Sequence, residues 1–312
     1  MAKVKAKSGL GKANKVLFII FIILLVATIL IVHFSSAKVP IVETAETEFV
    51  DEVKIDEFKA GTYGGKEFNS VDDVVNYYIE CYNYTKTLTA QYDDNGETKT
   101  YYKLLGDEGL SVENLLVEGK SNATIDKLVP GIMSSVFSGN VKGLPPAENR
   151  DPLEDIRDKG SENEIDRRTS PLLVDDVLAC NVVDNGDGTI NITIQPKAAL
   201  LSMPAADPQG RYFNVLGDIT STVESISILS FSEGTIDENF VVRYAGGSGT
   251  VTIDTKTNEI ISADYEMDVH IDVSHATVTV IKDKSASLDI VYTNHFPATD
   301  DYLKESKGMS RK

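Results

Sequence analysis

Histidine and carboxylate side chains are the first residues in this chain that could carry chemistry. His270 stands between Asp268 and Asp272 in an alternating stretch, so the three side chains share one face of a predicted strand. Imidazole and carboxylate groups are metal ligands, which makes this face a candidate for a weak metal site. Such neighbours are also common on an acidic, solvated sheet face without a metal. His275 falls on the opposite parity, so we predict no metal site and no cofactor.

Two glycine-rich segments resemble ligand loops, but turns explain them better. Residues 184–189 read Asp-Asn-Gly-Asp-Gly-Thr, and Gly186 and Gln195 occupy positions where an EF-hand requires an oxygen ligand and a glutamate. Residues 246–249 are followed by a strand pattern. A phosphate-binding loop would instead be followed by a Lys-Ser/Thr pair and a helix. We predict a hairpin turn at each. No Ser, Cys or Thr nucleophile lies in a recognisable signature. The sequence therefore favours a protein that is not an enzyme, although catalytic residues that converge only in space would leave no motif.

The chain contains two cysteines, Cys81 and Cys180. Cys81 flanks the apolar stripe of a predicted helix, and Cys180 shares a predicted strand face with Leu178 and Val182. Both thiols therefore point toward the place where helix and sheet meet. On the outer side of a cell membrane such a pair can form a disulfide, which here would close a loop of about a hundred residues. Two buried free thiols are an equal alternative.

Charge is divided sharply along the chain. The first fifteen residues contain five lysines, and all 48 acidic residues lie from Glu43 onward. Binding to nucleic acid requires a basic patch, and the acidic part shows none. We therefore expect no nucleic-acid partner.

Residues 16–34 form an apolar run without Asp, Glu, Lys or Arg. As a helix its nineteen residues would extend about 28 Å, the thickness of the hydrocarbon core of a bilayer. The preceding lysines predict a single-pass segment in the cell membrane, with residues 1–15 in the cytoplasm and the remainder outside. The alternative is a signal peptide cleaved near Ser35-Ser36-Ala37, but the apolar run is longer than the 7–15 residues usual there. We favour a retained anchor.

The exported part begins with an acidic stalk or linker at residues 35–67, and an α+β domain follows at 68–298. Ser70 is a predicted N-cap for an amphipathic helix over 71–84. A hairpin is predicted around the Asp-Asp-Asn-Gly sequence at 93–96, and a second helical stretch at 125–137. Residues 141–170 are predicted to form a long surface loop, and 299–312 a polar tail.

The C-terminal half reads as a series of short strands. They are predicted at 177–183, 189–195, 225–231, 240–244, 250–254, 259–273, 276–281 and 287–296. Within 259–273, Tyr265, Met267, Val269 and Ile271 share one face. Such strands with turn residues between them indicate an antiparallel sheet with one buried face. The predicted class is α+β, with an N-terminal transmembrane helix followed by an ectodomain whose antiparallel sheet packs on one or two helices.

Three stretches together resemble a known kind of protein. They are the helix at 70–84, the hairpin at 180–195 with its Asp-Asn-Gly-Asp-Gly-Thr turn, and the strand and turn at 251–260 that lead into a long strand pair. The combination resembles uncharacterised exported or membrane-anchored surface proteins of Gram-positive, clostridia-like bacteria. The resemblance implies a bacterial cell-surface location and brings no catalytic residues.

The sequence favours a membrane-anchored extracytoplasmic domain that acts as a non-enzymatic binding or interaction module. Its expected partners are the membrane, through residues 16–34, and an envelope protein, glycan or lipid. One alternative is a carrier of an apolar ligand such as a lipid, with a pocket between helix and sheet lined by Val74, Tyr78, Met267 and Val269. Another is a cell-envelope hydrolase, which needs a cleft where a nucleophile or paired carboxylates meet a base.

Overall fold

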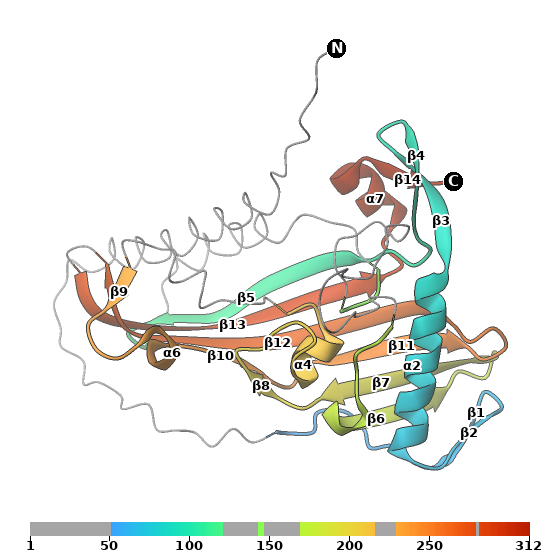
Figure 1. Ribbon diagram of the computed structural model, residues 1–312, viewed down its shortest axis with the longest axis horizontal. Coiled ribbons are helices and arrows are strands. Elements are labelled where there is room, and N and C mark those ends of the chain that lie inside the picture. The colour runs from blue at the N-terminus through green and yellow to red at the C-terminus, as the bar shows by residue number, and fades with distance from the viewer. Residues whose placement is uncertain (1–50, 121–142, 147–168, 216–228, 279–280) are drawn as a thin grey trace, which may run out of the picture.

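The computed structural model of the 312-residue chain describes residues 51–120, 143–146, 169–215, 229–278 and 281–312 (Figure 1). Strands hold 49% of the structure and helices 19%. The predicted α+β class is therefore wrong, because the described domain is mostly β. No helix within the described ranges is both long and apolar enough to cross a membrane. The predicted anchor at 16–34 and the predicted helix at 125–137 lie outside the described residues.

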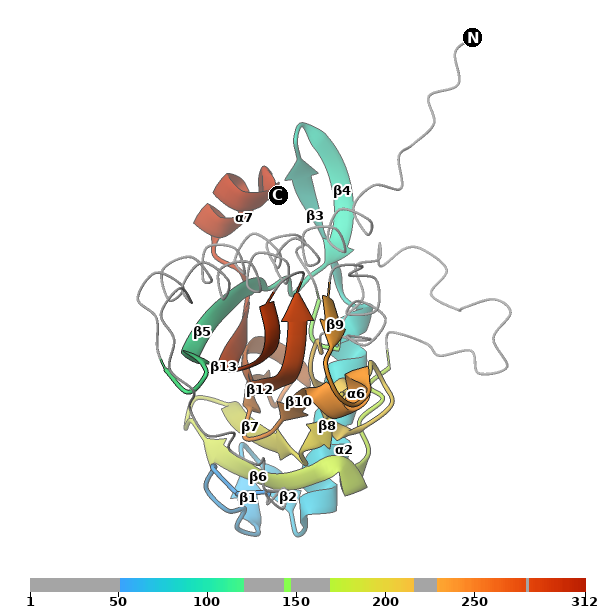
Figure 2. The same cartoon turned by 90° about the vertical axis from the view of Figure 1, so that its left-hand side faces the viewer.

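A nine-stranded antiparallel sheet forms the body of the domain, and it is strongly curved (Figures 1 and 2). Its strands run longer than the sequence predicted, because the patterns at 259–273 and 276–281 belong largely to one strand that continues through bulges. The main path is, in spatial order, β5 (Asp107–Val117), β13 (Ile281–Phe296), β12 (Glu259–Val278), β11 (Ser248–Asp254), β7 (Thr189–Pro196) and β6 (Val177–Asp184).

Three shorter strands complete the sheet. These are β9 (Leu229–Phe231), β10 (Phe240–Tyr244) and β8 (Ala199–Leu200), of which β9 and β10 pair with β12 and β8 pairs with β10. Strands β9, β10 and β11 pair in succession with the same edge of β12, at Val278–Ala276, Val273–Val269 and Glu266–Glu259. Residues 245–247 therefore join two strands, β10 and β11, that lie end to end, and our prediction of a hairpin turn at 246–249 is wrong.

Two other hairpins are confirmed. Strands β6 and β7 pair across the turn at 185–188. Strands β3 (Thr89–Asp94) and β4 (Glu97–Tyr102) pair across Asn95-Gly96. The β3–β4 hairpin stands apart from the large sheet and forms a second, three-stranded sheet with β14 (Met309–Arg311).

The predicted amphipathic helix is also confirmed, as α2 (Val71–Thr87). It begins with a capping box, in which the Ser70 side chain accepts from the Asp73 backbone N–H and the Asp73 carboxylate accepts from the Ser70 N–H. Hydrogen bonds from the backbone of Asn69 and Ser70 and from the Ser70 side chain lower the pKa of Asp73. The helix lies across one face of the sheet (Figure 1), and its apolar stripe is buried in the main core.

Several segments predicted to be irregular are ordered parts of the domain. Residues 51–60, which we call the strap, are fixed to the sheet and lead into the small hairpin β1 (Gly61–Tyr63) and β2 (Lys66–Phe68). The predicted tail contains α7 (Asp300–Lys307) and β14, which pairs with β3. Short helices occur at η1 (Val174–Asp176), α4 (Pro208–Tyr212) and α6 (Ile236–Asn239). The domain thus includes much of the predicted stalk and tail.

Candidate functional site: the polar face of the sheet

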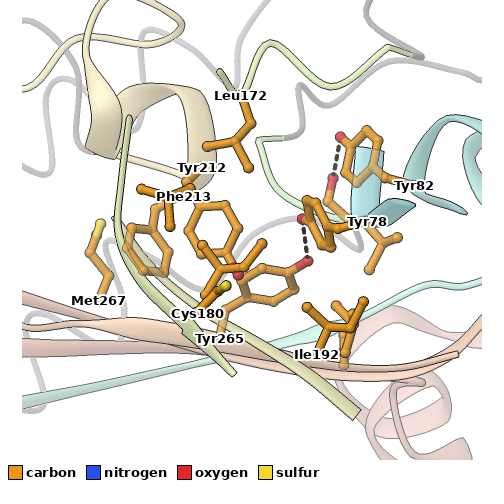
Figure 3. Packing of buried hydrophobic residues seen from close by; sticks show 14 of the residues in the cluster. Tyr78, Tyr82, Leu172, Cys180, Ile192, Tyr212, Phe213, Tyr265 and Met267 are labelled. Atoms are coloured by element: carbon orange, nitrogen blue, oxygen red, sulfur yellow. Dashed lines mark hydrogen bonds between the residues drawn. The ribbon is translucent and has the colours of Figure 1, made fainter. Parts of the chain in front are cut away.

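The four residues predicted to line a ligand pocket lie together in the main core. Val74 is 0% exposed, Tyr78 1%, Met267 1% and Val269 2%. Aromatic side chains fill the space between α2 and the sheet (Figure 3). The Tyr78 ring lies 5.9 Å from that of Tyr212, and its hydroxyl is 3.0 Å from the Tyr265 hydroxyl. These contacts give the four residues a packing role.

Cys81 and Cys180 are both buried and free, so of the two alternatives the structure contains the free thiols and not the disulfide. Both thiols lie in the core between α2 and β6, as the sequence indicated. Burial raises the pKa of Cys81 to about 12 and that of Cys180 to about 11. A thiol with so high a pKa is almost entirely protonated at neutral pH, so neither cysteine is an activated nucleophile.

The opposite face of the sheet is polar, and its side chains stand in rows that cross the strands. Thr193 on β7, Thr250 on β11, Asp264 on β12 and His295 on β13 are successive register partners. The two threonine hydroxyls are 2.8 Å apart, and His295 Nδ1 is 2.6 Å from Asp264 Oδ1. We call this the first row.

A second row lies six residues further along β12, about 20 Å away at the rise of an extended strand. Here Arg243 on β10, His270 on β12 and Asp289 on β13 are register partners. His270 Nδ1 is 2.5 Å from Asp289 Oδ1, and its Nε2 is 3.2 Å from Asp272 Oδ1. Arg243 also binds Asp272. At the far end of the row, Asn114 Nδ2 on β5 donates to Asp289 Oδ2 over 2.8 Å.

The strap crosses the same face near β7. Gln195 is 1% exposed, and its side-chain amide forms two hydrogen bonds with the strap backbone. Its Oε1 accepts from Lys54 N–H over 2.8 Å, and its Nε2 donates to Glu52 O over 2.7 Å. The Lys54 ammonium then reaches Asp268 on β12, at 3.2 Å. The strap therefore reaches the acidic strand between the two rows.

In the described ranges, the histidines of this region are paired with carboxylates rather than with a hydroxyl nucleophile. Each histidine in the described ranges places Nδ1 on an aspartate carboxylate, including His275 on Asp283 at 2.7 Å. Ser232 lies beside that pair, but its hydroxyl donates to Asp283 and to the His275 carbonyl. A serine nucleophile instead requires a hydrogen bond to the imidazole. The arrangement therefore lacks the connection that a serine hydrolase needs.

Within the described residues, no group of three or more His, Cys, Asp and Glu side chains could hold a metal ion. His270 contacts Asp272 and Asp289, whereas His275 contacts Asp283. Asp268 is instead paired with Lys54.

Sequence reasoning missed Arg243, Asp289 and Asn114. Alternation along 287–296 was sufficient to place Asp289 and His295 on one face of β13. The register that brings Asp289 to His270 is set by long-range strand pairing, and no local pattern contained it.

Comparisons with known proteins found no matching family model, and no match among the curated proteins or the solved structures.

Proposed function

We propose that this chain is a non-enzymatic binding module, displayed outside a bacterial cell membrane and held there through the apolar segment 16–34. We further propose that the polar face of the nine-stranded sheet is its contact surface for a partner in the cell envelope. The location rests on the apolar run and on the lysines before it.

The observation that carries this proposal is the difference between the two faces of the sheet. One face is closed by α2 and aromatic side chains, whereas the other presents hydroxyl, amide, imidazole and carboxylate groups in register. Its side chains remain accessible, since His270 is 42% exposed and His295 48%. Their positions are fixed by strand pairing, so little conformational entropy is lost when a partner forms hydrogen bonds with them.

The charge of this face indicates the chemistry of the partner. Asp264 and Glu266 are exposed on β12, and Asp268, Asp272 and Asp289 lie nearby. The chain as a whole has a formal net charge of −18. An anionic polymer would be repelled, so the face fits a partner that carries basic, hydrogen-bonding groups.

Binding of a lysine-rich peptide to the full-length chain in detergent micelles tests this assignment. We expect binding that weakens as salt rises from about 50 to about 300 mM. We also expect it to fall at least tenfold in a variant that carries neutral amides on β12. That variant combines Asp264→Asn, Glu266→Gln and Asp268→Asn.

The matched control removes the same number of charges from exposed acids outside the polar face. It carries Glu67→Gln, Glu80→Gln and Glu305→Gln, where Glu67 belongs to β2, Glu80 to α2 and Glu305 to α7. We expect this control to lose no more than the small effect of reduced net charge. If both variants lose binding equally, net charge alone attracts the peptide and the polar face is not the contact surface.

A further inference from the structure

Lys86 is a buried amine near the C-terminal end of α2, and the residue is only 3% exposed. The Nζ atom donates to the Leu144 carbonyl over 3.0 Å. It also lies 4.5 Å from the centre of the Tyr102 ring and 5.6 Å from that of Tyr82. Within the described residues, no carboxylate forms an ion pair with it.

The partner of Lys86 is a short segment, residues 143–146, that fits closely against α2 and β4. Leu144 is 1% exposed and belongs to the main core. The Tyr82 hydroxyl lies 3.3 Å from the Leu144 carbonyl and 3.4 Å from that of Pro146. A Cβ atom on Gly143 would come within 2.7 Å of the Tyr102 ring and 3.2 Å of Lys86 Nζ. The segment therefore lies against the amine with no room for a side chain at its first position.

We propose that Lys86 and Tyr82 form a pH-sensitive latch that holds residues 143–146 on α2, and that protonation of the Lys86 amine weakens it. An ammonium group in water has three hydrated N–H donors. Here one carbonyl and two ring faces replace that hydration only in part, whereas a neutral amine has much less to lose. The latch is therefore firmest when the amine is neutral.

The Lys86 amine is the group whose protonation changes, as a comparison with the titratable groups that face it shows. Among the described residues they are the phenols of Tyr82 on α2 and Tyr102 on β4, and residues 143–146 contain no titratable side chain. Burial raises the pKa of Tyr82 above its ordinary range, so this phenol remains neutral. Burial lowers the pKa of Lys86 from 10.5 to about 7.

The direction of the pH effect follows from this difference. When the latch opens, the amine meets water and regains its ordinary pKa, so the open state binds more protons than the closed state between pH 7 and 10.5. Closing is then favoured about tenfold more for each pH unit of increase within that window. Below about pH 7 both states are protonated, and the dependence levels off.

Hydrogen exchange at the Leu144 amide of the full-length chain tests the latch. Dividing the intrinsic exchange rate by the observed rate removes the ordinary pH dependence and gives a protection factor. We expect this factor to be lower than that of the Ile192 amide in the core, and to rise about tenfold per pH unit from about pH 7 to about pH 9.

Two variants accompany this measurement. In Lys86→Met, whose side chain is apolar and similar in length, the protection factor at Leu144 should be independent of pH. Lys66→Met is the control, because Lys66 also lies over a tyrosine ring, 5.3 Å from the centre of Tyr77. In this control the protection factor at Leu144 should rise with pH as it does in the unmodified chain.

Three results would overturn the proposal. They are a protection factor at Leu144 that does not change with pH, a slope that persists in Lys86→Met, and equal protection at Leu144 and Ile192, which would mean that only the whole domain opens. Should Lys86→Met fail to fold, an NMR titration of the Lys86 ε-carbon in the unmodified chain decides the matter. A midpoint at the ordinary value for lysine would contradict the latch.

Discussion

At the scale of single residues, a bidentate ion pair joins the buried Asp176 to Arg211. Arg211 Nε and Nη2 donate to the two carboxylate oxygens over 2.7 and 2.6 Å, and Asp176 is 3% exposed. The hydrogen bonds that Arg211 donates to Asp176 raise the pKa of Arg211. A bidentate pair of this kind is stable only while both partners remain, because either charge alone would be buried without compensation.

We predict that Arg211→Met lowers the free energy of unfolding by roughly 3–5 kcal/mol, since it leaves the Asp176 carboxylate buried and unpaired. Urea denaturation followed by far-UV circular dichroism measures this change. Arg243→Met is the matched control, because the side chains of Arg243 and its partner Asp272 are 25% and 28% exposed. Its cost should stay below about 1 kcal/mol. Equal losses in the two variants would show that burial does not set the strength of these pairs.

At the scale of elements, the sequence predicted what is determined locally. Ser70, Asp73 and the apolar spacing after them were sufficient to predict α2, and Asn95-Gly96 was sufficient for the β3–β4 turn. Alternation placed His270 and Asp272 on one face of β12. Contacts over long sequence distances were not predictable: the end-to-end arrangement of β10 and β11, the pairing of β14 with β3, and the approach of Asp289 to His270. Each depends on a register that neighbouring residues do not determine.

The segment between β10 and β11 allows a direct test of that distinction. A Cβ atom on Gly247 would lie 2.4 Å from the Glu266 carbonyl oxygen and 2.9 Å from the Met267 Cα atom. Backbone atoms of β12 cannot move aside cheaply, so we predict that Gly247→Ala costs roughly 1–3 kcal/mol of unfolding free energy. Ser248→Ala, the next residue along the chain, should cost much less. Thermal denaturation of both variants measures these losses of stability. A Gly247→Ala variant as stable as the unmodified chain would fit an open hairpin turn instead.

At the scale of the whole molecule, the strap is attached to the sheet and belongs to the folded domain. It joins the polar face through Gln195 and Ala198, since the Ala198 N–H donates to Asp51 Oδ1 over 2.7 Å. It also contributes Phe58, which packs against the main core. A simple linker would have no such contacts. The part of the predicted stalk that the structure describes is therefore a component of the fold.

We predict that a chain starting at residue 61 is less stable than one starting at residue 51 by roughly 3 kcal/mol. Loss of the strap removes the two hydrogen bonds to the Gln195 amide, about 1 kcal/mol each, and exposes the apolar surface that Phe58 covers, which adds about 1–2 kcal/mol. Urea midpoints of the two chains measure the difference, and the chain from residue 51 serves as the control because it keeps every strap contact. Equal midpoints would mean that residues 51–60 are the flexible linker that their composition indicated, and that the Gln195 contacts do not stabilise the domain.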